Sequence, residues 1–242
     1  MRTENKFCIF HFAVVGFFLL LTISCSKSSS QPDILPTSDV DGNVYNTVTI
    51  GSQVWMVENL NTTRYNNGDP IPTVTDNTQW ATLTSGALCT YNNVTPPNSY
   101  YGKLYNWFAV NDPRNIAPPG WHVATNEDWI ELENFVASNS GASGSVAKIL
   151  AAGIDWIIST SVNAVGNDLN INNISGFSGL PGGIRSGIDG SFSNFGLTGA
   201  WWSSSENNVN TGWRHALNNN QSIVDKSNIS KTYGFTVRCV KN

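Results

Sequence analysis

The chain has 242 residues, of which 40% are hydrophobic and 11% aromatic, so it is long enough to bury a sizeable core. Only 12% of the residues are charged, and the formal net charge is −4. Because the sequence has no basic cluster, nucleic acid is not expected as a partner. The low charge, together with 21 Gly, favours one loop-rich extracellular β or α+β domain over a helical cytosolic enzyme.

The N-terminal residues predict export. Arg2 and Lys6 precede a nearly continuous apolar run over residues 7–23, which ends in small residues. This order is typical of a secretory signal peptide, and the run is marginal in length for a membrane span. An uncleaved anchor stays open as the alternative.

The end of this run also resembles a bacterial lipobox. Residues 21–25 read Leu-Thr-Ile-Ser-Cys, with Thr where Leu is usual. The resemblance implies a lipoprotein signal peptide over residues 1–24, diacylation of Cys25 and attachment to a bacterial membrane. We expect a flexible polar tether over residues 25–37 and a lipid-anchored protein of the cell envelope, in the outer membrane. An ordinary signal peptide that happens to contain a cysteine is the alternative.

Two further cysteines, Cys89 and Cys239, lie beyond this segment. An oxidising envelope and an even number of thiols favour a disulfide between them. Free buried thiols are the alternative, because Cys is also common as a small core residue.

The folded domain is predicted over residues 38–242 and begins with a β-hairpin. Residues 44–50 alternate apolar and polar side chains, a Gly-Ser turn follows, and residues 53–57 return. The Asp-containing turn at residues 39–43 lacks the spacing and the distal Glu of an EF-hand loop. We interpret it as a solvated turn, and calcium remains a ligand without a supporting motif.

A capped helix follows a short strand after Pro118. Thr125 is a good N-cap, and Asp128 three residues later can complete a capping box. An apolar stripe then recurs at helical spacing, formed by Trp129, Leu132, Phe135 and Val136. A second, short helix is predicted over residues 146–152.

The last third of the chain reads as loops with short strands. Residues 174–185 are too rich in glycine for a regular element and are expected to lie closely over the core. Residues 199–206 read as a strand that enters a loop. Residues 213–217 and 234–240 are expected as closing strands.

Several blocks, in order along the chain, are similar to the Fibrobacter succinogenes major paralogous domain. They include the Trp-Trp-Ser-Ser-Ser and Gly-Phe-Thr-Val-Arg-Cys-Val runs, and they cover residues 42–45, 50–60, 101–107, 119–123, 201–205 and 233–240. The family occurs in surface and secreted bacterial proteins, often lipoproteins. More distantly, the blocks resemble the C-type-lectin-like superfamily, which includes sugar-binding lectins and sulfatase-modifying enzymes. That resemblance implies an α+β fold with two helices on a twisted antiparallel sheet and long irregular loops.

Signatures of common enzyme classes do not occur in the sequence. Beyond the signal peptide, the chain has two histidines, His122 and His215, which excludes a histidine-rich metal site. We interpret His122 as a packed, hydrogen-bonded core histidine rather than a catalytic base. An enzyme of the sulfatase-modifying type would need paired thiols, and neither Cys89 nor Cys239 lies in a block that matches that arrangement. No catalytic, metal-ligating or cofactor-binding residue is predicted.

The best binding candidates are the tryptophan pair at residues 201–202 and polar and aromatic residues that follow it. Exposed Trp rings stack on sugars, and Glu and Asn supply partners for hydroxyl groups or oxygens for calcium. The candidate ligand-binding residues are Trp201, Trp202, Glu206, Asn207, Trp213 and Arg214. The alternative is that Trp201 and Trp202 alternate on a strand, with at least one buried.

We therefore expect a lipid-anchored envelope protein that recognises a glycan or a surface protein non-covalently. One alternative is an enzyme of the sulfatase-modifying type. The other is a structural or adhesive envelope component with no small ligand.

Overall fold

The computed structural model describes residues 36–94, 99–139 and 145–242. The predicted signal peptide, Cys25 and most of the predicted tether lie outside these residues. The strands are β1 (Thr37–Ser38), β2 (Val44–Tyr45), β3 (Thr47–Ile50), β4 (Gln53–Met56), β5 (Leu88–Cys89), β6 (Leu104–Tyr105), β7 (Trp121–Val123), β8 (Gly182–Arg185), β9 (Phe192–Phe195), β10 (Thr198–Asn208), β11 (Thr211–Asn218), β12 (Asp225–Ser230) and β13 (Cys239–Lys241). The α-helices are α1 (Asn77–Ala81), α2 (Trp107–Val110), α3 (Asn126–Asn139) and α4 (Val146–Leu150).

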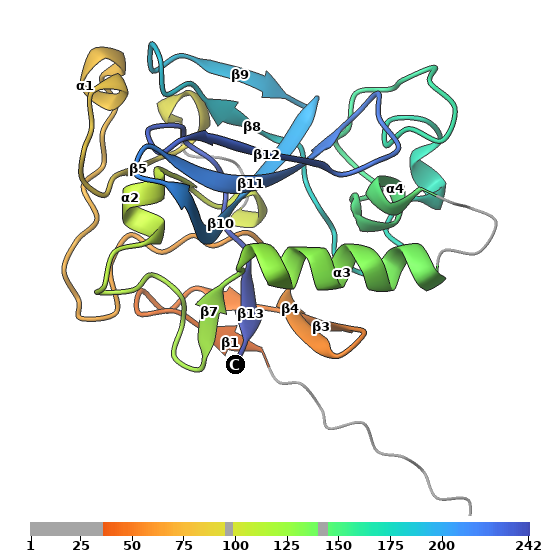
Figure 1. Cartoon of the computed structure of the whole chain (residues 1–242), viewed down its shortest axis with the longest axis horizontal. Coiled ribbons are helices and arrows are strands. Elements are labelled where there is room, and N and C mark those ends of the chain that lie inside the picture. Colours follow the sequence, from red (N-terminus) through yellow and green to blue (C-terminus); the bar gives the residue numbers. More distant parts are fainter. Residues whose placement is uncertain (1–35, 95–98, 140–144) are drawn as a thin grey trace, which may run out of the picture. The chain divides into compact units, whose positions relative to one another are not determined.

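The architecture is α+β, with antiparallel strand pairing in each sheet (Figure 1). A four-stranded sheet has the order β3-β4-β13-β7, and a three-stranded sheet has the order β10-β11-β12. The predicted N-terminal hairpin is confirmed by β3 and β4, in which Thr47 pairs with Met56. The C-terminal strand β13 lies between β4 and β7, so the end of the chain closes the sheet that the hairpin begins.

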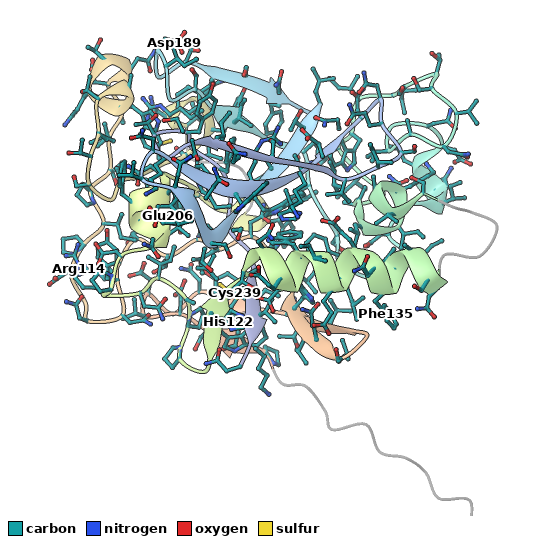
Figure 2. All side chains as sticks on the ribbon, in the orientation of Figure 1. Arg114, His122, Phe135, Asp189, Glu206 and Cys239 are labelled. Carbon is teal, nitrogen blue, oxygen red and sulfur yellow. The ribbon has the colours of Figure 1, made fainter. Side chains whose placement is uncertain are left out.

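Helix α3 is held by the predicted capping box. The Asp128 amide donates to Thr125 Oγ1 at 3.1 Å, and the Thr125 amide donates to Asp128 Oδ2 at 2.8 Å. Of the predicted apolar stripe, Trp129, Leu132 and Val136 are buried. The prediction was wrong for the fourth residue of the stripe, Phe135. Its side chain is 42% exposed and lies on the side of α3 that faces away from the three-stranded sheet (Figure 2).

The other predicted elements agree less closely with the structure. Of the predicted closing strand over residues 234–240, only residues 239–240 lie in a strand, β13. The predicted helix over 146–152 is α4, which Ser145 caps and which ends at Leu150. The glycine-rich segment 174–185 was wrongly denied a regular element, because its last four residues form β8. The strand needs glycine at position 183. Its φ is +69°, which favours glycine, and a Cβ there would stand 2.5 Å from the ring of Tyr91.

The predicted disulfide between Cys89 and Cys239 is wrong, because both are buried free thiols. Cys89 packs with Trp80 and Leu104, whereas Cys239 packs in another part of the core with Tyr45. Their strands belong to different sheets, which places the two sulfur atoms in separate clusters. Burial raises the pKa of Cys89 to about 11 and also raises the pKa of Cys239, so both remain protonated at neutral pH.

A buried polar cluster, which we call the Arg238 hub, joins segments far apart in the chain. The guanidinium of Arg238 is fully buried and donates to Asn59 Oδ1 at 2.7 Å. It also donates to the carbonyl oxygens of Met56, Phe177 and Ser178, at 2.9, 2.7 and 3.0 Å. Burial lowers the pKa of Arg238, because the charged form loses its hydration. Oxygen acceptors on every side offset that loss.

We expect Arg238→Met to lower the free energy of unfolding by about 3–5 kcal/mol, the range for breaking a buried charged contact. The reason is that several buried oxygen atoms would lose their donor. Urea unfolding followed by tryptophan fluorescence measures the change. The matched control is Lys241→Met, whose side chain is exposed, and it should change stability by less than about 0.5 kcal/mol. Equal effects of the two substitutions would contradict this account of the hub.

We also expect Cys89 and Cys239 to be alkylated separately when the protein is unfolded under non-reducing conditions, because the structure holds them as free thiols. In the folded protein both should resist iodoacetamide, since they are buried and protonated. Peptide mass spectrometry reads out both results. A peptide pair cross-linked through these two residues is the finding that would contradict the structure.

Candidate functional site

The tryptophan pair of the predicted ligand-binding set is buried. Trp201 is 1% exposed and Trp202 is 0% exposed. Trp201 Nε1 donates to Asn59 Oδ1 and Trp202 Nε1 donates to the Tyr105 carbonyl oxygen, both at 2.8 Å. Neither ring can offer a face to a ligand, so the prediction of an exposed stacking surface at these two positions was wrong. The alternative, that at least one of the pair is buried, is confirmed.

Both faces of β10 are covered where the pair lies. Successive strand residues point to opposite faces, so a strand with one solvated face would bury only one of the two rings. Here the Trp201 ring contacts Phe177, with ring centroids 5.9 Å apart, and the Trp202 ring contacts Phe235 at 4.6 Å. The strand therefore separates two parts of the core, which the sequence pattern of Trp-Trp did not reveal.

Glu206 and Asn207 lie beyond the buried part of β10. The Glu206 side chain is 51% exposed and forms an ion pair with Lys231, whose side chain is 8% exposed. The Lys231 ammonium also lies over the ring of Trp107, 4.4 Å from its centroid. Asn207 donates to Thr211 Oγ1 at 2.9 Å across the β10–β11 turn. Both Glu206 and Asn207 are exposed and therefore accessible to a ligand.

Trp213 and Arg214 are both half-buried on β11. Because they are consecutive strand residues, their side chains point to opposite faces of the sheet. Lys226 lies over the Trp213 ring at 5.2 Å, and Arg214 forms an ion pair with Asp225 at 2.7 Å. The structure thus does not gather the predicted residues into one site. It buries two, places two at the strand end and divides the last two between faces.

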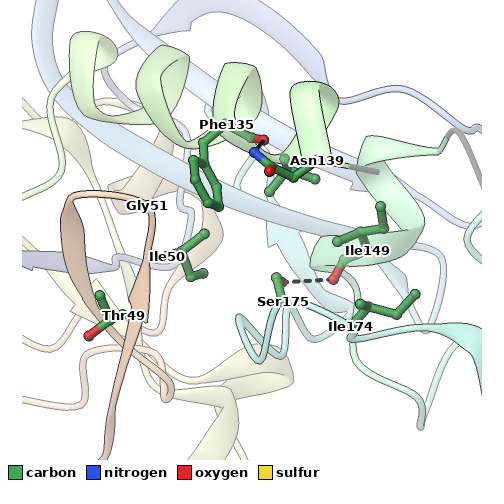
Figure 3. Close-up of a pocket in the computed structure, with 9 residues that line it drawn as sticks. Thr49, Ile50, Gly51, Phe135, Asn139, Ile149, Ile174 and Ser175 are labelled. Carbon is green, nitrogen blue, oxygen red and sulfur yellow. Dashed lines mark hydrogen bonds between the residues drawn. The ribbon is translucent and has the colours of Figure 1, made fainter. Parts of the chain in front are cut away.

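A small pocket opens between the N-terminal hairpin and α3 (Figure 3). Its volume is about 300 Å³, and the Phe135 ring lies over Gly51 at its edge. Asn139 donates to the Phe135 carbonyl oxygen at 2.7 Å, and Ser175 donates to the Ile149 carbonyl oxygen at 2.8 Å. Asn139 and Ser175 are thus bonded to the backbone, whereas the buried hydroxyl of Thr49, which also lines the pocket, has no hydrogen-bond partner among the described residues. No charged side chain, histidine or cysteine lies among the lining residues.

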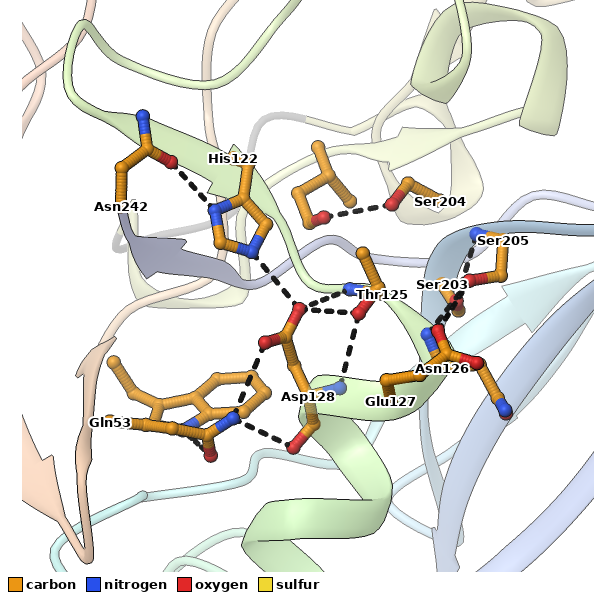
Figure 4. Close-up of polar contacts among 12 residues, drawn as sticks. Gln53, His122, Thr125, Asn126, Glu127, Asp128, Ser203, Ser204, Ser205 and Asn242 are labelled. Atoms are coloured by element: carbon orange, nitrogen blue, oxygen red, sulfur yellow. Dashed lines mark hydrogen bonds and ion pairs between the residues drawn. The ribbon is translucent and has the colours of Figure 1, made fainter.

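The serines after the tryptophan pair fasten β10 to the start of α3 (Figure 4). Ser204 Oγ donates to the Val123 carbonyl oxygen at 2.9 Å. The Asn126 amide donates to Ser205 Oγ at 3.0 Å, which satisfies one of the free amides at the helix N-terminus. The Trp-Trp-Ser-Ser-Ser run is therefore a structural element along its whole length.

A family model decides the relationship that these blocks suggest. The model of the Fibrobacter succinogenes major domain matches residues 48–241, which is most of the chain. The chain belongs to this family. No curated protein and no solved structure matches the chain.

In this Fibrobacter succinogenes major domain, the buried histidine His215 has a structural role. His215 is 0% exposed, and its ring stacks on Trp129 with centroids 5.0 Å apart. Its Nδ1 lies 2.6 Å from Glu133 Oε1, and its Nε2 lies 3.3 Å from Asn126 Oδ1. The ring joins α3 to β11, and both nitrogen atoms are occupied.

His122 joins the helix cap to the C-terminus (Figure 4). Its side chain is 37% exposed, with Nε2 3.0 Å from Asp128 Oδ2 and Nδ1 2.7 Å from Asn242 Oδ1. The hydrogen bond to Asp128 raises the pKa of His122, because it favours the charged imidazolium. The expected hydrogen bonding is present, but the side chain lies at the surface rather than in the core.

Residues missed by the sequence analysis include Glu133, Lys231 and Asn59. Each lies far along the chain from its partner, so no local spacing marks it. In the described ranges, no group of three or more His, Cys, Asp or Glu side chains could hold a metal ion. Nor does any helix of the described chain have the length and apolar character to cross a membrane.

We expect the stability of the protein to fall as pH rises from about 5.5 to about 8.5, in part because His122 loses its proton. The pKa of His122 is higher in the folded protein than in the unfolded chain, where it is about 6.5. The stabilisation by the protonated ring is therefore complete below the unfolded pKa and is lost as the pH rises through the folded pKa. Urea unfolding at the two pH values measures the fall. In His122→Gln the fall should be smaller, and an unchanged fall would show that this ring does not contribute.

Proposed function

We propose that this protein is a lipid-anchored binding protein of the bacterial cell envelope, held in the outer membrane through Cys25, which recognises a glycan non-covalently. We further propose that its domain has the C-type-lectin-like fold. Support for the fold comes from the α+β architecture and from the C-terminal strand β13, which pairs with the N-terminal hairpin strand β4. The irregular segments between strands are long, as that fold requires.

The observation that carries the binding proposal is that residues of the family blocks are buried or hydrogen-bonded within the protein. Trp201 and Trp202 are bonded in the core, Ser204 bonds to a backbone carbonyl, and Arg238 is fully buried. Such blocks build a scaffold, and recognition is left to exposed loops and strand ends. The sulfatase-modifying alternative is disfavoured, because its paired reactive thiols would have to be Cys89 and Cys239, which are buried and protonated.

Trp213 is the aromatic residue of the predicted set that keeps access to solvent. Its ring is half-buried on β11, and Asn207 donates to Thr211, whose side chain lies on the same face of the sheet as Trp213. Glu206 pairs with Gly212 and therefore lies on the other face. An aromatic ring stacks on the apolar face of a sugar, while amide groups bond its hydroxyls. The outer half of β10–β11 is thus suited to a glycan.

We expect the full-length chain, purified in mild detergent, to bind saturably to a glycan array. Trp213→Ala should weaken binding about fivefold or more, because it removes the stacking ring. The control is Phe195→Ala, which removes another exposed aromatic ring from β9 and should leave binding intact. If the chain binds nothing on a broad array, the glycan proposal is refuted, and a surface-protein ligand or a purely structural role is favoured.

A further inference from the structure

A second pocket, which we call the α2 pocket, lies beside α2. Its volume is about 550 Å³, within the range of small-molecule sites. Trp107 and Phe108 of α2 supply its aromatic wall, and the loops that carry Pro70, Ser85 and Arg114 supply the rest. Arg114 marks this side of the molecule in Figure 2.

The pocket is held rigid by one buried side chain, Asn106. Its Oδ1 accepts hydrogen bonds from the amides of Ala87 and Ala109, at 3.0 and 3.1 Å. Its Nδ2 donates to the Ser85 carbonyl oxygen at 2.8 Å. The side chain thereby caps α2 and ties the facing loop to it, so the walls are fixed before any ligand binds.

The charges of the pocket neutralise one another in part. Arg114 donates to Asp112 through Nε at 2.9 Å and Nη2 at 2.8 Å, and to Asp69 through Nη1 at 3.1 Å. Two carboxylates facing one guanidinium leave a net negative charge, which opposes an anionic ligand. Among the described residues, no third carboxylate, His or Cys side chain joins Asp69 and Asp112 to form a metal site.

Tyr65 lies buried behind the pocket and is not one of the residues that line it. It is 0% exposed, and its hydroxyl lies near Asp112 and Arg114. The hydroxyl lies against Gly86, where a Cβ would stand 2.1 Å from it, and the guanidinium of Arg114 covers the ring at 3.9 Å. Burial, followed by the charge of Asp112, raises the pKa of Tyr65 to about 12, so the hydroxyl keeps its proton.

We propose that the α2 pocket binds an uncharged sugar ring of hexose size, without calcium. Phe108 stacks on the apolar face of the ring, and the carboxylate of Asp112 accepts hydrogen bonds from its hydroxyls. Asn111 and Ser85 at the rim offer further polar partners. The inference rests on the proposed glycan-binding function and gives it a different site and a ligand class.

The α2 pocket is connected to the strand end that carries Glu206. Trp107 Nε1 donates to the Ser203 carbonyl oxygen at 3.0 Å, and its ring packs under the Lys231 ammonium that pairs with Glu206. A chain of sugars whose first ring occupies the pocket therefore has a polar surface beside it on which to continue.

The test uses the full-length chain in detergent and the methyl glycosides of glucose, galactose and mannose, with glucuronic acid as the charged comparison. Binding is followed by ¹⁵N–¹H NMR shifts and titrated with and without EDTA. We expect at least one neutral glycoside to bind, glucuronic acid to bind more weakly and EDTA to have no effect. Asp112→Asn and Phe108→Ala should each weaken binding about tenfold. The matched control Asp189→Asn, whose carboxylate bonds only within its own turn among the described residues, should not.

The outcomes separate this inference from the proposed function. Binding that is lost in Trp213→Ala and retained in Asp112→Asn and Phe108→Ala would overturn the α2 pocket while keeping the glycan function. Strict dependence on calcium or a preference for glucuronic acid would also overturn the inference. The inference would also be overturned if the wild type binds the glycan array but the neutral glycosides cause no NMR shift near α2. A chain that binds neither the array nor the glycosides would refute both proposals.

Discussion

The buried guanidinium of Arg238 is the constraint on which the rest of this fold depends. A charge taken out of water is costly unless oxygen atoms replace its hydration, and here they come from Asn59 and three backbone carbonyls. Asn59 Oδ1 also accepts from Trp201, and its amide donates to the Tyr101 carbonyl. The hub therefore fixes the N-terminal hairpin, the middle loops, β10 and the C-terminal segment relative to one another.

This arrangement explains why the family blocks are poor guides to a ligand. A residue that must satisfy a buried charge or fill the space between two sheets cannot also face solvent. Trp201 and Trp202 divide β10 between two parts of the core, and the serines that follow bond to the start of α3. Exposed side chains lie instead in the loops around α2 and at the β10–β11 turn. Recognition on a rigid scaffold is a common use of such loops.

Local features of the sequence predicted local features of the structure. The capping box of Thr125 and Asp128 is confirmed, because both partners lie three residues apart and the helix geometry brings them together. The hairpin of β3 and β4 is confirmed for a similar reason, since alternation and a short turn determine its register. Phe135 shows the limit: helical spacing places it near the stripe, but the width of the buried face depends on what packs against the helix.

The sequence by itself determined the family, the hairpin, the capped helix and the presence of a large aromatic core. Only the tertiary structure decided that Cys89 and Cys239 stay apart, that both tryptophans of the pair are buried, and that Asn106 and Arg114 shape a pocket beside α2. The physical reason is the range of the interactions. Turns, caps and alternation act between residues a few positions apart. Other features depend on strands and loops that meet only in the folded chain. These features are the burial of both faces of β10, the neighbours of each thiol and the pairing of Arg114 with Asp69.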